Sequence, residues 1–241
     1  MAASFETDCS MFLDPVKLAE MDGEAFRAAH PYPWANPAGL LTDEGYRELV
    51  AELPDVARFK PVFGRSRKHG QQSHDRYALE WRDDLPVAES WKAFVDELRG
   101  PTYTDFLARM IGHDRFALKF HFHYTPNGCS VSPHCDAVWK LGSHIFYFNT
   151  EDDWKPEWGG ETQVLDDRGR FPARSAPAFE DFDEALSSES IGNRSLLFIR
   201  SGNSWHGVKP IDCPEGYLRK VFIVVINNDK PWYRLRSRLK I

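Results

Sequence analysis

Two histidines and one aspartate are the residues of this chain whose types and spacing best suit chemistry. His134 and Asp136 are two positions apart, and His206 follows 70 residues later. Residues two apart on a β-strand point to the same face, so His134 and Asp136 can contact one ion. Two neutral imidazoles and one carboxylate form a facial triad, which leaves metal positions open for a co-substrate and O₂. A His-x-Asp pair alone is a weak signal, so its surroundings must support the prediction.

The segments before these ligands predict that both ligand sites lie at strand starts. A turn-rich stretch at 125–133 precedes His134. An apolar run at 195–199 and a turn at 201–204 precede His206. We therefore expect the three ligands to meet at one end of a barrel.

A second histidine group offers a competing metal site. A cupin-like site would use His121 or His123 together with His134. Aromatic residues alternate with these two histidines between positions 119 and 124. The alternation predicts that the aromatic row faces the core and that His121 and His123 turn outward, which disfavours the cupin alternative.

The elements that position the ligands fall into a helical part and a strand-rich part. Thr42, with acidic residues after it, predicts a helix start, and Pro54 predicts its end. Apolar residues at helical spacing predict further helix over 86–111, with a break at Gly100. We expect residues 1–115 to be a mostly helical support region.

The strand-rich part predicts the fold class. Short apolar runs separated by turns fill residues 116–228, as in a β-sandwich or jelly roll. The prediction is one α+β domain over 1–241, in which N-terminal helices pack on a jelly-roll core. A long loop is expected at 170–190, either bordering the active site or as a surface excursion. A basic tail, expected to be solvated, follows at 229–241.

Composition excludes several classes of protein. The net charge of −6 disfavours a general nucleic-acid binder. No apolar run approaches the roughly 18 residues of a membrane span, and the N-terminus lacks a secretory pattern. The four cysteines form no CxxC pair, so we expect free thiols and a cytoplasmic location. They are Cys9, Cys129, Cys135 and Cys213.

Several motifs follow one another in a fixed order across residues 116–228. They are Tyr124-Thr-Pro-Asn-Gly, His134-Cys-Asp136, Tyr147-Phe-Asn149, Trp158-Gly-Gly-Glu, His206-Gly-Val-Lys-Pro, and Arg219 at the head of the last apolar strand. Together they resemble the Fe(II)- and 2-oxoglutarate-dependent oxygenases of the prolyl-4-hydroxylase-like type. The resemblance implies a double-stranded β-helix with the metal at one mouth.

The resemblance also implies cofactors and a reaction. His134, Asp136 and His206 would bind Fe(II), with 2-oxoglutarate and O₂ as co-substrates and ascorbate as an accessory reductant. The expected reaction is hydroxylation of an unactivated C–H bond, and the carboxylate at 136 favours hydroxylation over halogenation. A small molecule, such as an amino acid derivative or a natural-product intermediate, is favoured over a protein prolyl residue as substrate.

The co-substrate residues come from the same resemblance. Arg219 would pair with the distal carboxylate of 2-oxoglutarate, a task that suits a guanidinium. Tyr147 would add a hydrogen bond, and Tyr124 would lie near the iron. Because an extra turn at 212–216 lengthens the spacing after His206, Lys220 is an alternative to Arg219.

Two other functions and several polar segments remain open from the sequence. The chain could be a cupin-like metalloprotein without 2-oxoglutarate, or a non-catalytic jelly-roll binding module. The basic segment 65–76 could contact an anionic or polyhydroxylated substrate, or be a solvated loop. Trp139 and Trp205 could line the pocket or belong to the core. The oligomeric state is not predicted.

Overall fold

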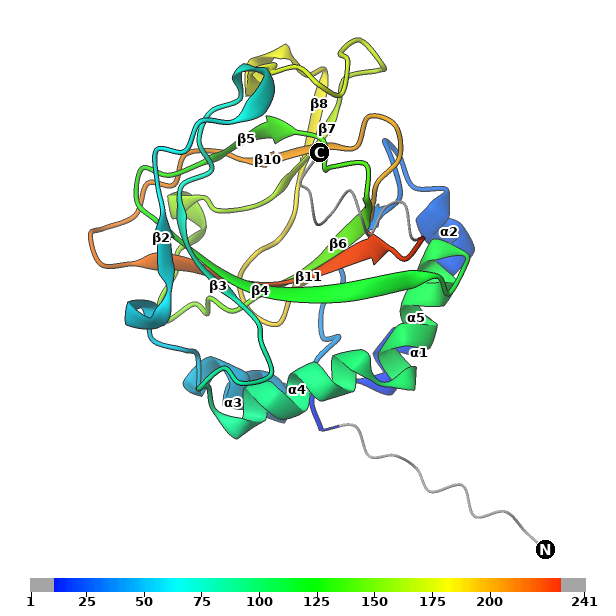
Figure 1. The fold of residues 1–241 in the computed structure, drawn as a ribbon, viewed down its shortest axis with the longest axis vertical. Helices are drawn as coiled ribbons and strands as arrows, with labels where there is room; N and C mark the ends of the chain where they lie inside the picture. Colours follow the sequence, from blue (N-terminus) through cyan, green and yellow to red (C-terminus); the bar gives the residue numbers. More distant parts are fainter. Residues whose placement is uncertain (1–10, 231–241) are drawn as a thin grey trace, which may run out of the picture.

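The computed structural model describes residues 11–230, which form two β-sheets and a layer of helices (Figure 1). The larger sheet has seven strands in the order β1-β9-β6-β11-β4-β3-β2, and the smaller has four in the order β5-β10-β7-β8. All pairings between these strands are antiparallel. This arrangement confirms the predicted fold class, a jelly-roll core with helices packed on it.

The elements have the following bounds. The helices are α1 (Pro15–Glu20), α2 (Gly23–Arg27), α3 (Asp43–Ala51), α4 (Glu89–Arg99) and α5 (Pro101–Ile111). The large sheet contains β1 (Trp34–Ala35), β2 (Lys60–Val62), β3 (Arg76–Glu80), β4 (Phe116–Pro126), β6 (Lys140–Tyr147), β9 (Ser195–Ile199) and β11 (Leu218–Asn228). The small sheet contains β5 (Val131–His134), β7 (Gln163–Asp166), β8 (Glu184–Ser187) and β10 (Trp205–Val208).

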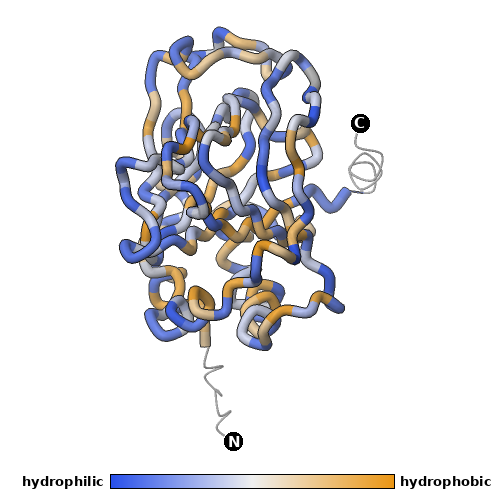
Figure 2. The backbone as a smooth tube through the Cα atoms, turned by 90° about the vertical axis from the view of Figure 1, so that its left-hand side faces the viewer, coloured by the Kyte–Doolittle hydropathy of each residue, from blue (hydrophilic) through white to orange (hydrophobic). Residues whose placement is uncertain are grey.

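The predicted helices form where the capping signals place them. The Thr42 side chain accepts a hydrogen bond of 3.0 Å from the Gly45 backbone N–H at the start of α3. Gly100 ends α4 and caps α5, and Pro101 occupies the first position of α5. Apolar residues gather where the helices meet the large sheet, and the tube in Figure 2 is more polar along the outer loops.

Two boundary predictions need correction. Residues 1–115 are not simply helical, because they supply β1 to one edge of the large sheet and β2 and β3 to the other. These strands are short and partly exposed, so they lack a clear apolar alternation. The predicted loop at 170–190 contains β8, which pairs with β7 although its Glu-Ala-Leu-Ser sequence is largely exposed.

A buried histidine in the core predicts a pH dependence of folding. His144 of β6 is fully buried, its Nδ1 lies 2.8 Å from the Tyr103 hydroxyl, and burial lowers its pKa from 6.5 to about 3. Below pH 6.5 the His144 imidazole is protonated in the unfolded chain but stays neutral in the folded chain. The free energy of unfolding therefore decreases as the pH drops from 6.5 towards 3. From pH 7 to pH 5, wild type should lose about 2 kcal/mol more than His144→Phe, measured by urea unfolding. Equal losses in the two proteins would contradict this assignment.

Candidate active site

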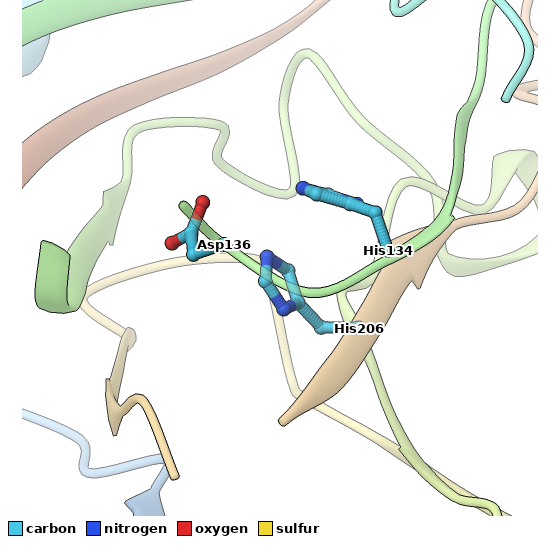
Figure 3. Close-up of side chains that lie close together, drawn as sticks. All are labelled: His134, Asp136 and His206. Atoms are coloured by element: carbon cyan, nitrogen blue, oxygen red, sulfur yellow. The ribbon is translucent and has the colours of Figure 1, made fainter. Parts of the chain in front are cut away.

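The His134, Asp136 and His206 side chains converge on one point between the sheets. His134 ends β5, Asp136 follows it, and His206 lies in β10 directly opposite His134 in the antiparallel register. Their ligand atoms all lie within 4.8 Å of one another, and the side chains surround a shared space (Figure 3). His134 lies at a strand end rather than the predicted strand start, because antiparallel neighbours bring the end of one strand to the start of the next.

Backbone hydrogen bonds orient both imidazoles. Nδ1 of His134 lies 3.0 Å from the Ser132 carbonyl oxygen, and Nδ1 of His206 lies 3.1 Å from the Ser204 carbonyl oxygen. A carbonyl only accepts, so each Nδ1 carries the proton and each Nε2 keeps its lone pair. This is the tautomer that a metal ligand needs.

The carboxylate is also held in the ionised form. Burial alone would raise the pKa of Asp136, but the adjacent Lys140 ammonium brings it below its ordinary value. The Lys140 ammonium donates to Oδ1 at 2.7 Å. Burial lowers the pKa of both His134 and His206. Two neutral imidazoles beside one carboxylate therefore fit a divalent cation, because binding requires no proton to leave.

A pocket of about 300 Å³ adjoins the triad, and Arg219 lies in it. The guanidinium is buried, its Nε donates to the Gly160 carbonyl, and its Nη2 donates to Thr162 Oγ1 at 3.2 Å. Within residues 11–230 it forms no ion pair with a carboxylate, and burial lowers its pKa. Lys220 lies on the opposite face of β11 and pairs with Asp153. Of the two candidate anchors, only Arg219 faces the pocket.

The two predicted tyrosines lie in different places. The Tyr147 hydroxyl is 3.0 Å from Thr162 Oγ1 and 2.8 Å from Ser188 Oγ, and the Arg219 guanidinium lies 5.5 Å from the centre of its ring. Tyr147 thus supports Arg219 through the shared partner Thr162.

Tyr124 does not lie near the triad, which corrects the expectation from the resemblance. Its hydroxyl donates to the Pro54 carbonyl at 3.1 Å, and its ring stacks on Phe59 at 4.2 Å. Side chains alternate along β4, so Tyr124 shares the helix-facing side with Phe122.

The same alternation bears on His121 and His123. They lie opposite the aromatic row, as predicted, and both are half-buried; His121 lines a groove on this face of the large sheet, and His123 lines that groove and the pocket beside the triad. His123 Nε2 accepts a hydrogen bond of 3.3 Å from Arg76, and burial holds the pKa of His123 well below its ordinary value. Neither histidine belongs to a metal-compatible cluster of residues 11–230, which removes the ligands that the cupin alternative requires.

The basic segment 65–76 contributes residues that the triad motif does not reveal. Arg67, His74 and Arg76 line the pocket. The His74 ring lies 4.6 Å from that of His134, and its Nε2 is 3.1 Å from Ser132 Oγ. These three side chains reach the pocket, whereas residues 65, 66, 69, 70 and 72 of the same segment are exposed. Thr162 carries no sequence signal beyond its place after the Trp-Gly-Gly-Glu motif.

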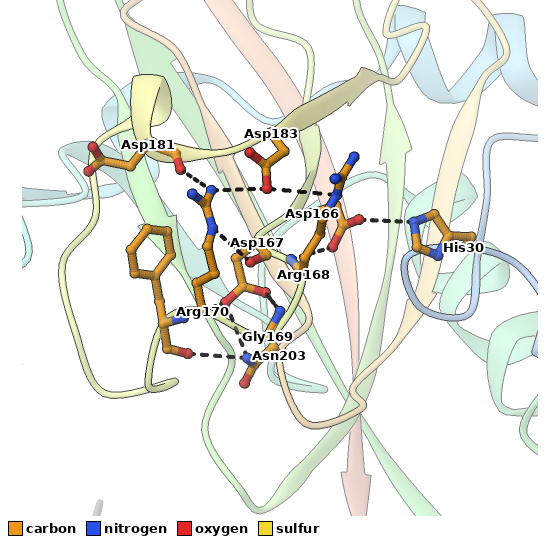
Figure 4. Close-up of polar contacts among 10 residues, drawn as sticks. His30, Asp166, Asp167, Arg168, Gly169, Arg170, Asp181, Asp183 and Asn203 are labelled. Carbon is orange, nitrogen blue, oxygen red and sulfur yellow. Dashed lines mark hydrogen bonds and ion pairs between the residues drawn. The ribbon is translucent and has the colours of Figure 1, made fainter.

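A polar network holds the turn before His206 (Figure 4). The buried Asp167 carboxylate accepts from the backbone N–H of Gly169 at 3.1 Å and of Phe171 at 2.8 Å, and from the Asn203 side chain at 3.2 Å. At the edge of the network, His30 Nε2 lies 3.0 Å from Asp166 Oδ2. The loop after β7 is thereby fixed to the turn that leads into β10.

The remaining predicted features are distributed as follows. Cys129, Cys135 and Cys213 are free thiols, whereas Cys9 and most of the basic tail (231–241) lie outside the described residues. Trp205 is fully buried and packs on Phe182, and Trp139 lines a neighbouring groove rather than the pocket. Among the helices of residues 11–230, none is long and apolar enough to cross a membrane.

Comparison with known proteins defines the class. Residues 119–226 match the family model of the 2OG-Fe(II) oxygenase superfamily, a span from early β4 almost to the end of β11. This match covers somewhat less than half of the chain and supports an oxygenase of this superfamily, with Fe(II), 2-oxoglutarate and O₂ as its cofactors. No curated protein matches the chain in sequence.

Solved structures share the fold at low sequence identity. A Pseudomonas putida prolyl-4-hydroxylase is 18% identical, with 86% of this chain and 99% of that chain covered and a TM-score of 0.58. A Trichoplax adhaerens prolyl hydroxylase, in complex with a hypoxia inducible factor peptide fragment, is 15% identical, with 92% and 94% covered and a TM-score of 0.63. The α-ketoglutarate-dependent epimerase SnoN from nogalamycin biosynthesis is 13% identical, with 89% and 84% covered and a TM-score of 0.54.

Proposed function

We propose that this oxygenase hydroxylates a small molecule and holds Fe(II) with His134, Asp136 and His206. The observation that carries the proposal is the convergence of two Nε2 lone pairs and one ionised carboxylate, with both Nδ1 protons bound to backbone carbonyls. When bound, the iron would supply the oxidising chemistry, namely O₂ activation coupled to decarboxylation of 2-oxoglutarate.

The protein's own residues position the co-substrate. Arg219 would receive the distal carboxylate of 2-oxoglutarate, because its buried guanidinium has no carboxylate partner within residues 11–230. Thr162 accepts a hydrogen bond from that guanidinium and the Tyr147 ring packs against it, so both residues hold it in position. Lys140 holds Asp136 in place, so the triad needs little rearrangement when the metal arrives.

Three further points belong to this proposal. The chain works as one domain, since β1, β2 and β3 from the N-terminal part extend the large sheet of the core. The substrate is a small molecule, because the solved relatives include a natural-product enzyme and the pocket of about 300 Å³ suits a small ligand. The free thiols suit a reducing cytoplasm.

The test is an anaerobic titration of the purified protein with Fe(II) and then 2-oxoglutarate. A weak visible charge-transfer band should appear only after both are added, with a stoichiometry of one per chain. Succinate release in air should then require both as well. Iron binding without the band would sink the proposed co-substrate site and favour a metalloprotein that does not use 2-oxoglutarate.

A further inference from the structure

The pocket beside the triad adjoins a wider groove of about 880 Å³. The two hollows share Arg76, His123 and Lys140 in their linings. The sheet register explains this continuity, because Lys60 of β2 lies opposite Ala78 of β3, and Ala78 lies opposite His123 of β4. Residues on one face of the large sheet therefore line the groove at the β2 edge and the pocket beside the triad.

This groove is strongly basic. Its lining holds six lysines and arginines against one carboxylate, that of Glu80. The whole chain carries a net charge of −6, so the excess of cations here is local and does not follow from composition. The cations are Arg58, Lys60, Arg76, Arg82, Lys119 and Lys140. Walls of one charge sign in a cleft concentrate the opposite charge.

Two arginines that line the pocket, Arg67 and Arg76, lack an ion-pair partner among the described residues. Arg76 donates to His123 Nε2 at 3.3 Å and to the His74 carbonyl at 2.6 Å, and Arg67 reaches only the Gln71 side-chain oxygen, at 3.4 Å. Neither forms an ion pair with a carboxylate of residues 11–230. Burial lowers the pKa of both, and the charge of Arg67 lowers that of Arg76 further.

Two of the groove's other cations are already paired with carboxylates. Lys140 pairs with Asp136 at 2.7 Å, and Arg82 pairs with Asp84 at 3.2 Å. Arg67 and Arg76 repel each other and lie partly out of water without an ion-pair partner among the described residues, which costs free energy. An incoming anion would offset that cost, since a guanidinium binds a carboxylate or a phosphate with two parallel hydrogen bonds.

We propose that Arg67 and Arg76 form a subsite for an anionic group on the substrate, a carboxylate or a phosphate, with the basic groove taking up further negative charge. This inference rests on the proposed function and names the substrate class for the same site. Arg219 would hold 2-oxoglutarate, so the co-substrate and the substrate would each have their own arginines.

The test measures anion binding by the metal-free full-length protein with isothermal titration calorimetry. The probes are inorganic pyrophosphate and the tricarboxylate tricarballylate, whose relative affinities distinguish a phosphate from a carboxylate preference. Wild type should bind at least one probe, with an affinity that falls as salt rises. Arg76→Gln should weaken that binding by at least tenfold, whereas Arg76→Lys should retain most of it. Arg47→Gln is a matched control, because this arginine is exposed on α3 away from the pocket, and it should bind the probes as wild type does.

The outcomes separate this inference from the proposed function. Arg219→Gln should bind the probe as wild type does, and loss of binding in Arg219→Gln but not in Arg76→Gln would overturn the subsite. Absence of binding to both probes at millimolar concentration would also overturn it. If Arg76→Gln does not fold, Arg67→Gln provides the same test. Failure of the proposed function looks different: the chelate band is missing while the probe still binds.

Discussion

Replacing His206 with alanine is expected to abolish iron binding and 2-oxoglutarate turnover. Losing only a residue that hydrogen bonds a metal ligand costs roughly 10- to 100-fold in metal affinity, so losing the ligand should cost more than about 100-fold. His206 lies opposite His134 on the neighbouring strand, and no other described histidine or carboxylate completes this cluster. Anaerobic Fe(II) titration followed by metal analysis measures the loss.

The matched control changes histidines that line the same hollow without belonging to the cluster. His121→Ala combined with His123→Ala should leave the iron content at one per chain. Loss of iron in this double variant, with iron retained in His206→Ala, would reverse the assignment and restore the cupin alternative. Circular dichroism of each variant shows whether the fold survives.

Replacing Arg219 with methionine should weaken 2-oxoglutarate binding without lowering the stability of the metal-free protein. Removing one partner of a buried, hydrogen-bonded charge pair costs about 2 kcal/mol or more, so 2-oxoglutarate should bind roughly 30-fold more weakly or worse. The metal-free protein should become no less stable, because the change removes a buried cation that has no carboxylate partner in the described structure. The two readouts are the 2-oxoglutarate dependence of the chelate band and the thermal midpoint without ligands.

Lys220→Met provides the control for Arg219. It is the adjacent cation, but it faces the other side of β11 and pairs with Asp153. It should therefore leave the affinity for 2-oxoglutarate unchanged. A weaker co-substrate affinity in Lys220→Met with an unaffected Arg219→Met would show that the anchor had been misassigned. A purely structural role for Arg219 predicts a lower thermal midpoint with unchanged co-substrate binding.

Local chemistry and strand alternation made much of this architecture predictable from the sequence. Thr42, Gly100 and Pro101 fix helix ends through backbone hydrogen bonding and a restricted backbone, so their effects need no distant partner. The core strands were recognisable because their apolar runs and turns repeat from residue 116 onward. β2 and β8 were not recognisable, because their residues are largely exposed and their pairing partners supply the stability.

The residues of the candidate site were predictable where they belong to a sequence motif. They were less predictable where the direction of a side chain decides whether it reaches the pocket. Alternation along β4 correctly placed the aromatic row and the two histidines on opposite faces. It did not show that helices cover one face while the other face lines a groove and the pocket beside the triad. The prediction for Tyr124 was wrong because it relied on the residue's place in the motif. The alternation of side chains along β4 puts Tyr124 on the helix-facing side with Phe122. Arg67 and Arg76 lie more than 50 residues before the triad in the chain, so only the fold brings them to it.

The two faces of β4 also bear on how this protein could diverge. Phe120 and Phe122 on one face are tied to the helix layer, where a change of volume is felt throughout the core. His121 and His123 on the other face meet the hollow, and neither contributes to that packing. Alternate residues of one strand thus face the packed core and the proposed substrate pocket. On the proposed function, substitutions at His121 and His123 can therefore change which substrates bind without disturbing the packing of the core.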